Sequence, residues 1–325
     1  MRNLSTLAWR VYDAPTKPWH GVVADTEGDD SVYVMRVERR DGVSQLTLAH
    51  ITPTGTEELA VLEVASAPPH VPDVADFRLL ADGGSSVNHM PAICVIGSGG
   101  DIVLMPVDEE ASAPAEVVGS VDQGILAAAW SPEEDVLVLI TGGEKRLIVM
   151  TREFEVMSET MLSTEAFGDD QPVNVGWGSK STQFHGSEGK QAAMAAANAP
   201  EESDPRGPLV PEDDGLPRIS WRGDGAFFVT SSAEASNDAV HRILRTYTRT
   251  GTLSATSDRS VRGISHVLAC RPTGNLIATT QRMGGPWAPG RHGRHDVVFF
   301  ERNGLRHGEF SLREEHGSVP DVPGV

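Results

Sequence analysis

Short runs of apolar and β-branched residues, separated by turn residues, fill most of the 325-residue chain. Residues 31–37 and 45–51 alternate apolar and polar positions, as strands with one buried face do. Residues 92–96 and 101–105 are apolar runs on either side of a Gly-Ser-Gly-Gly segment, which predicts a hairpin. Residues 226–231 form a continuous apolar and β-branched run, typical of a strand covered on both faces. We therefore predict an all-β protein built from many short strands.

One phrase recurs four times in this chain: a bulky residue ends a strand, a turn follows, and another strand begins. The copies start at Trp130, Trp177, Trp221 and Cys270, which are spaced 44 to 49 residues apart. Repeats of this length made of short strands are typical of a WD40-type β-propeller, with one four-stranded blade per repeat. We count about six blades of a seven-bladed ring and expect a truncated propeller that is not fully closed. The repeated residues are interpreted as packing positions between blades.

The predicted propeller covers residues 1–316 and carries two insertions. Residues 199–217 hold five prolines and six acids against one arginine, so we expect a mobile surface insertion with little packing. Residues 283–295 form a basic loop rich in Gly and Pro between two strands of one blade. Residues 317–325 are predicted to be a disordered tail.

Charge and composition narrow the class of protein. The net charge of −19 argues against simple coating of nucleic acid. Only Cys94 and Cys270 are present, which favours a reduced, intracellular protein. No apolar run approaches the roughly 18 residues that span a bilayer, and the N-terminal residues lack a secretory signal pattern. We expect a cytoplasmic protein, with the nucleus as a second location, and no membrane partner.

Residues 240–306 are unusually basic, with eleven arginines, no lysine and three acids. One interpretation is a set of solvated strand edges, balanced by acids elsewhere. The other is a docking face for an acidic partner or for RNA phosphate. The candidate docking residues are Arg242, Arg245, Arg249, Arg302 and Arg306.

Several fragments resemble active-site motifs without meeting their requirements. Residues 97–100 lack the third glycine of a dinucleotide-binding loop, and residues 186–190 lack the first glycine and the Ser or Thr of a phosphate loop. His292, His295 and His307 have no nearby Cys and favour a solvated basic loop over a metal site. We expect no catalytic residues, no cofactor and no metal.

Several long phrases resemble one particular family, the N-terminal propeller of the largest subunit of the Elongator complex, also called the IKK-complex-associated protein. The opening Met-Arg-Asn-Leu fits the usual start of that family. The matching phrases are residues 118–132, 173–193 (VNVGWGSKSTQFHGSEGKQAA), 219–228 (ISWRGDGAFF) and 295–310 (HDVVFFERNGLRHGEF). They occur in the family's order and are not shared with generic WD repeats, and the resemblance spans nearly the whole chain.

The resemblance implies a non-catalytic scaffold in a complex that modifies the wobble uridine of tRNA. The family places two N-terminal propellers before an α-helical solenoid and a C-terminal dimerisation region. The chemistry belongs to another subunit with radical-SAM and acetyltransferase domains, and a further propeller subunit is a second expected partner. The family's dimerisation region and basic tRNA-contacting segment lie beyond the part matched here, so tRNA is expected only through the assembled complex. A generic WD-repeat adaptor of another intracellular complex is the alternative.

Overall fold

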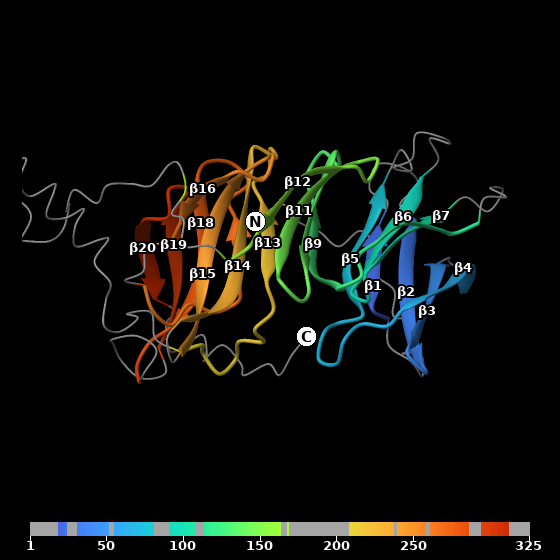
Figure 1. Ribbon diagram of the computed structural model, residues 1–325, viewed down its shortest axis with the longest axis horizontal. Coiled ribbons are helices and arrows are strands. Elements are labelled where there is room, and N and C mark those ends of the chain that lie inside the picture. Colours follow the sequence, from blue (N-terminus) through green and yellow to red (C-terminus); the bar gives the residue numbers. More distant parts are fainter. Residues whose placement is uncertain are drawn as a thin grey trace, which may run out of the picture. The chain divides into compact units, whose positions relative to one another are not determined.

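The computed structural model is all-β over the residues that it describes (Figure 1). These residues are 19–24, 31–51, 55–80, 91–107, 114–163, 168, 208–236, 239–257, 261–285 and 294–311. They contain twenty strands, and within these ranges there is no helix that could span a membrane. The all-β prediction is confirmed. The chain divides into two compact units, Met1–Asp122 and Gln123–Val325.

The first unit holds two four-stranded antiparallel sheets. Each sheet is a meander, in which every strand pairs with the strands before and after it in the sequence. One sheet consists of β1 (Gly21–Ala24), β2 (Val32–Arg40), β3 (Val43–Ile51) and β4 (Thr56–Ala65). The other consists of β5 (Val74–Leu80), β6 (Ala92–Gly97), β7 (Asp101–Pro106) and β8 (Glu116–Ser120).

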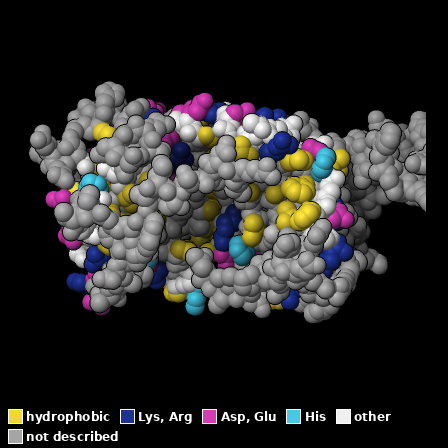
Figure 2. Space-filling model, turned by 180° about the vertical axis from the view of Figure 1, so that it is seen from behind, with side chains coloured by type: hydrophobic (Ala, Val, Ile, Leu, Met, Phe, Trp, Pro, Cys, Tyr) yellow, Lys and Arg dark blue, Asp and Glu magenta, His cyan; other side chains and the backbone are white. Residues whose placement is uncertain are grey.

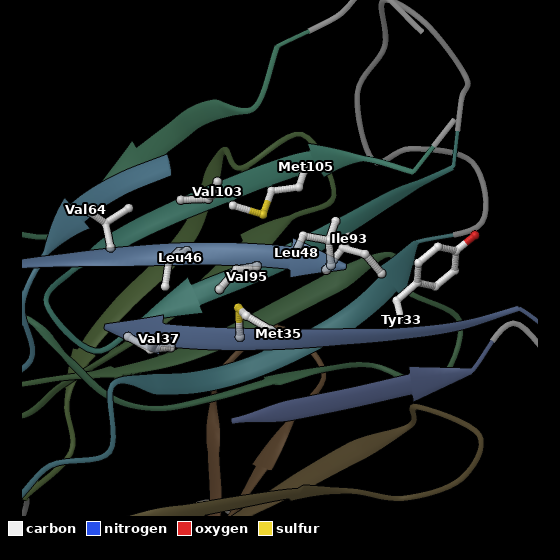
Figure 3. Close-up of a cluster of buried hydrophobic side chains, with 10 residues drawn as sticks. All are labelled: Tyr33, Met35, Val37, Leu46, Leu48, Val64, Ile93, Val95, Val103 and Met105. Carbon is white, nitrogen blue, oxygen red and sulfur yellow. The ribbon is translucent and has the colours of Figure 1, made fainter. Parts of the chain in front are cut away.

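Alternating side chains of these two sheets make one buried cluster (Figure 3). Met35 and Leu48 come from the first sheet and Val95 and Val103 from the second, and all four are fully buried. Each strand contributes every second residue because successive side chains point to opposite faces. Tyr33, Met35 and Val37 are the row of β2 that faces this cluster. Val34 on the other face is also buried, so β2 lacks the solvent-exposed face expected from the sequence.

The second unit holds three meanders of the same kind. The first contains β9 (Ile125–Trp130), β10 (Val136–Thr141), β11 (Arg146–Thr151) and β12 (Val156–Met161). The next contains β13 (Arg218–Trp221), β14 (Phe227–Ser236), β15 (Ala239–Thr248) and β16 (Leu253–Thr256). The last contains β17 (Ala269–Cys270), β18 (Leu276–Arg282), β19 (His295–Glu301) and β20 (Arg306–Ser311).

The middle sheet, β13–β16, is covered on both faces. Phe228 packs with Val138 and Val149 of the β9–β12 sheet. Its neighbour Phe227 packs with Ile277 and Phe300 of the β17–β20 sheet. Both phenylalanines are almost fully buried. This explains the continuous apolar run at residues 226–231, because a strand between two sheets has no solvent face.

The first strands of the three sheets lie next to one another, as far as the described residues go (Figure 1). Trp221 at the end of β13 donates its Nε1–H to the carbonyl of Ala129 on β9, at 3.2 Å. Cys270 at the end of β17 donates its backbone N–H to Oγ of Ser220, at 2.9 Å. Trp130 ends β9, is 3% exposed and meets Phe154 edge to face. Trp177 lies outside the described residues.

Five of the six predicted blades correspond to these five sheets. The sixth, expected around Trp177, falls in residues that the structure does not describe. Tight turns inside the sheets depend on glycine where two backbones approach. Gly100 has a φ of +120°, and a Cβ there would stand 2.2 Å from the carbonyl oxygen of Val121. This is why residue 100, in the turn between β6 and β7, is a glycine.

The two predicted insertions are described in part. Residues 199–207 and 286–293 lie outside the described residues. Residues 208–217 pack against the β13–β16 sheet: Val210 is 2% exposed, and the backbone N–H of Leu209 donates to the carbonyl of Val240. This half differs from the expected mobile segment with little packing. The reason is that two of its acids, Glu212 and Asp213, pair with Arg282 and Arg242, which are distant in the sequence.

Candidate docking surface

Arg242 lies on β15 and its side chain is fully buried. Its Nε and Nη2 atoms donate to the two carboxylate oxygens of Asp213, at 2.7 and 2.5 Å. Its Nη1 atom donates to the carbonyls of Leu216 and Ser231, at 3.1 and 3.2 Å. A guanidinium that is enclosed and paired in this way cannot reach a partner unless the pair breaks.

Arg245 follows three positions later on β15, so it points to the opposite face of the sheet. It is 1% exposed and makes a two-pronged ion pair with Glu234 of the neighbouring strand, one contact being 2.9 Å. Burial alone would raise the pKa of Glu234. The hydrogen bond and charge of Arg245, with hydrogen bonds from Ser232 and Ser163, hold that pKa below its usual value.

The other three candidate docking arginines are partly exposed or exposed. Arg249 follows β15, donates to the carbonyl of Gly225 at 3.1 Å and pairs with Asp135. Arg302 follows β19, and its guanidinium lies 5.3 Å from the centre of the Phe227 ring. Arg306 begins β20 and pairs with Glu309 at 3.1 Å. The structure therefore does not bring the five residues together on one surface, and the docking hypothesis rests on these three.

Three consecutive acids of the segment before β13 each pair with a different arginine. Glu212 meets Arg282 of β18 at 2.7 Å. Asp213 meets Arg242 of β15, and Asp214 meets Arg218 of β13. Through Arg242 and Arg282, two of these pairs join the acidic insertion to the basic sector, which the sequence presents as separate features. We call the three pairs the ion-pair network. The network spans two neighbouring sheets.

Ligand atoms of Asp213, Asp214 and His266 lie within 4.8 Å of one another, a spacing that a metal ion could use. Both carboxylates already accept hydrogen bonds from arginines. The adjacent guanidiniums oppose a cation by charge repulsion. The geometry therefore fits an ion-pair network better than a metal centre.

The histidines singled out in the sequence lie apart. His295 begins β19 and lies 3.9 Å from Glu212, whereas Nδ1 of His307 lies 2.5 Å from Oε1 of Glu301 at the far end of that strand. His292 falls outside the described residues.

Sequence reasoning overlooked two arginines in turns. Arg222 directly follows the repeat residue Trp221, and its guanidinium lies 5.7 Å from the centre of the Phe227 ring. Arg271 directly follows the repeat residue Cys270 and is exposed. Both arginines occupy the position directly after a repeat residue, and this shared position could have identified them from the sequence. Figure 2 shows that charged side chains of both signs lie close together on the face it displays.

Comparison with known protein families shows to which family the chain belongs. The family model described as the ELP1 first N-terminal beta-propeller matches residues 1–321. The chain belongs to this family. The resemblance found in the sequence and the β-propeller fold class are thereby confirmed.

Relatives of this family include proteins from animals, fungi and a plant. The chain is 34% identical over 323 residues to Elongator complex protein 1 of Mus musculus, covering 96% of the chain and 21% of that protein. It is 40% identical over 221 residues to Elongator complex protein 1 of Oryctolagus cuniculus, covering 68% of the chain and 15% of that protein. It is 38% identical over 224 residues to Elongator complex protein 1 of Schizosaccharomyces pombe, covering 68% of the chain and 17% of that protein. The chain thus spans about a fifth or less of the length of these relatives. Its family makes it part of an Elongator subunit.

Proposed function

We propose that this chain is a non-catalytic docking module of the Elongator complex and supports modification of the wobble uridine of tRNA. The observation that carries the proposal is the family match over residues 1–321. A fold made of repeated four-stranded sheets presents a large rigid surface, which suits the binding of other macromolecules. Within the described residues, the Gly-Ser-Gly-Gly segment links β6 and β7, and Asp213 and Asp214 are held in ion pairs.

The expected partners are the subunit that carries the radical-SAM and acetyltransferase domains and a second propeller subunit. The chain would hold these subunits near one another, and tRNA would meet the chain only through the assembled complex. Cytoplasm is the proposed location, with the nucleus in addition.

Deletion of this propeller from the native protein tests the proposal. We expect loss of co-purifying Elongator subunits and a parallel fall in wobble-uridine modification, measured by mass spectrometry of tRNA nucleosides. Normal modification after the deletion would overturn the proposal. Capture of an unrelated set of subunits by the native protein would favour the generic WD-repeat adaptor.

A further inference from the structure

Four arginines from four separate turns gather at one end of the β13–β16 and β17–β20 sheets. In a four-stranded meander, the turn between strands one and two and the turn between strands three and four lie at the same end. These turns begin at Arg222, Arg249, Arg271 and Arg302. We call these four residues the arginine turns.

Contacts between the two sheets hold the arginine turns together. Arg222 and Arg302, eighty positions apart, both place their guanidiniums over the Phe227 ring. A Cβ on Gly223 would stand 2.7 Å from the carbonyl oxygen of Pro272, so the turns that follow Arg222 and Arg271 touch. Positive charges gathered at one end of the sheets attract a negatively charged partner.

Acids offset the arginine turns only in part. Arg249 pairs with Asp135 and lies 4.0 Å from Glu133, and Arg222 lies 3.4 Å from Asp224. Arg271 is exposed, and no acid among the described residues pairs with it. The turns that carry the four arginines contain one acid, Asp224. Among the described residues, the charge of Arg271 therefore remains available to a partner.

The neighbouring β9–β12 sheet presents the opposite charge at the same end. Its two turns, residues 131–135 and 152–155, hold one arginine and five acids: Glu133, Glu134, Asp135, Glu153 and Glu155. We call them the acidic turns. They border the arginine turns directly, because Asp135 pairs with Arg249 and a Cβ on Gly225 would stand 3.6 Å from Cδ of Pro132. One end of the second unit thus carries a positive and a negative half.

We propose that this two-signed end binds a polypeptide segment of mixed charge, with its acidic part on the arginine turns and its basic part on the acidic turns. The inference rests on the proposed docking function and names the surface and the chemistry of its partner. A nucleic acid fits less well, since its uniformly negative backbone would meet the acidic turns after crossing the arginine turns. A mixed-charge polypeptide is attracted by both halves.

Fluorescence anisotropy with the native protein that contains this chain tests the inference. The probe is a labelled peptide of six glutamates followed by six lysines; an alternating Glu-Lys peptide of equal composition and a single-stranded RNA of twelve nucleotides are the comparisons. We expect the block peptide to bind most tightly and its affinity to fall as salt rises. Two double variants each reverse the charge of one half: Arg271→Glu with Arg302→Glu, and Glu133→Lys with Glu134→Lys. Each should weaken binding of the block peptide about tenfold or more.

Arg146→Glu is the matched control, because Arg146 begins β11 at the opposite end of its sheet and is exposed. It should change affinity less than about twofold. Since Arg302 packs on Phe227, Arg271→Glu alone is a second variant that leaves this packing intact. Unchanged peptide binding by the reversed variants overturns the inference, as does tighter binding of the RNA through the same arginines. Failure here leaves the proposed function standing, because that function is judged separately by deletion of the propeller.

Discussion

Arg242 of β15 and Asp213 of the segment before β13 form an ion pair in which both side chains are fully buried. The guanidinium also donates to the carbonyls of Leu216 and Ser231. Charges that are removed from water are tolerated only when geometry and additional hydrogen bonds compensate for the lost hydration. The pair therefore fixes how residues 208–217 lie against the β13–β16 sheet.

Asp213→Ala should destabilise the protein by about 3–5 kcal/mol, because it leaves the buried Arg242 guanidinium without its counter-charge. Asp214→Ala is the matched control, since Asp214 and its partner Arg218 are each about a third exposed. Its cost should stay below about 1 kcal/mol. Urea unfolding measures both. Equal costs at the two adjacent positions would contradict the buried network.

Glu234→Gln should make stability less dependent on pH. The pKa of Glu234 is held below its usual value, so its ion pair with Arg245 stabilises the fold at neutral pH. That contribution is complete above the ordinary glutamate pKa and is lost as the pH falls through the lowered value. The variant should lose about 3 kcal/mol or more at pH 7.

The difference between wild type and Glu234→Gln should begin to narrow below the ordinary glutamate pKa of about 4.3. It should vanish as the pH falls through the lowered pKa of folded Glu234. Urea unfolding of both proteins at several pH values follows this difference. Glu309→Gln serves as a control, because Glu309 is 45% exposed in its pair with Arg306. A gap that stayed constant down to pH 3 would show that the charge of Glu234 is not what matters.

Trp130→Ala and Trp221→Ala should each cost about 3–5 kcal/mol, because each removes a large ring from the end of a first strand. Trp221→Phe distinguishes the contribution of ring packing to stability from that of the Nε1–H hydrogen bond. It keeps most of the packing on Phe228 but removes the Nε1–H donor to Ala129, which should cost about 1 kcal/mol. Thermal or urea unfolding gives the values. Near-neutral alanine variants would mean that the repeat positions were misassigned.

Both cysteines should resist alkylation while the protein is folded. Burial raises the pKa of the Cys270 thiol to about 11, although its hydrogen bond to Ser220 lowers it in part. Cys94 is fully buried. Iodoacetamide at pH 8 should therefore modify Cys270 about a hundredfold more slowly in the folded than in the urea-unfolded protein. Mass spectrometry of the two states measures this, and rapid labelling of the folded protein would place the thiol in a more open environment.

The sequence by itself determined that the chain is all-β and where several of its strands lie. Runs such as residues 226–231 predict strands, because side-chain alternation and turn residues are local properties of the chain. The spacing of Trp130, Trp221 and Cys270 likewise predicted repeated sheets, and each of these residues ends the first strand of its sheet.

Only the tertiary structure decided which charges face solvent and which face each other. Arg242 and Arg245 were candidates for a docking face, but folding brings Asp213 and Glu234 to them from 29 and 11 positions away. It also brings Arg222 and Arg302 to one ring, Phe227. The physical reason is that strand formation depends on residues close in sequence, whereas the partner of a charge depends on how separate sheets pack.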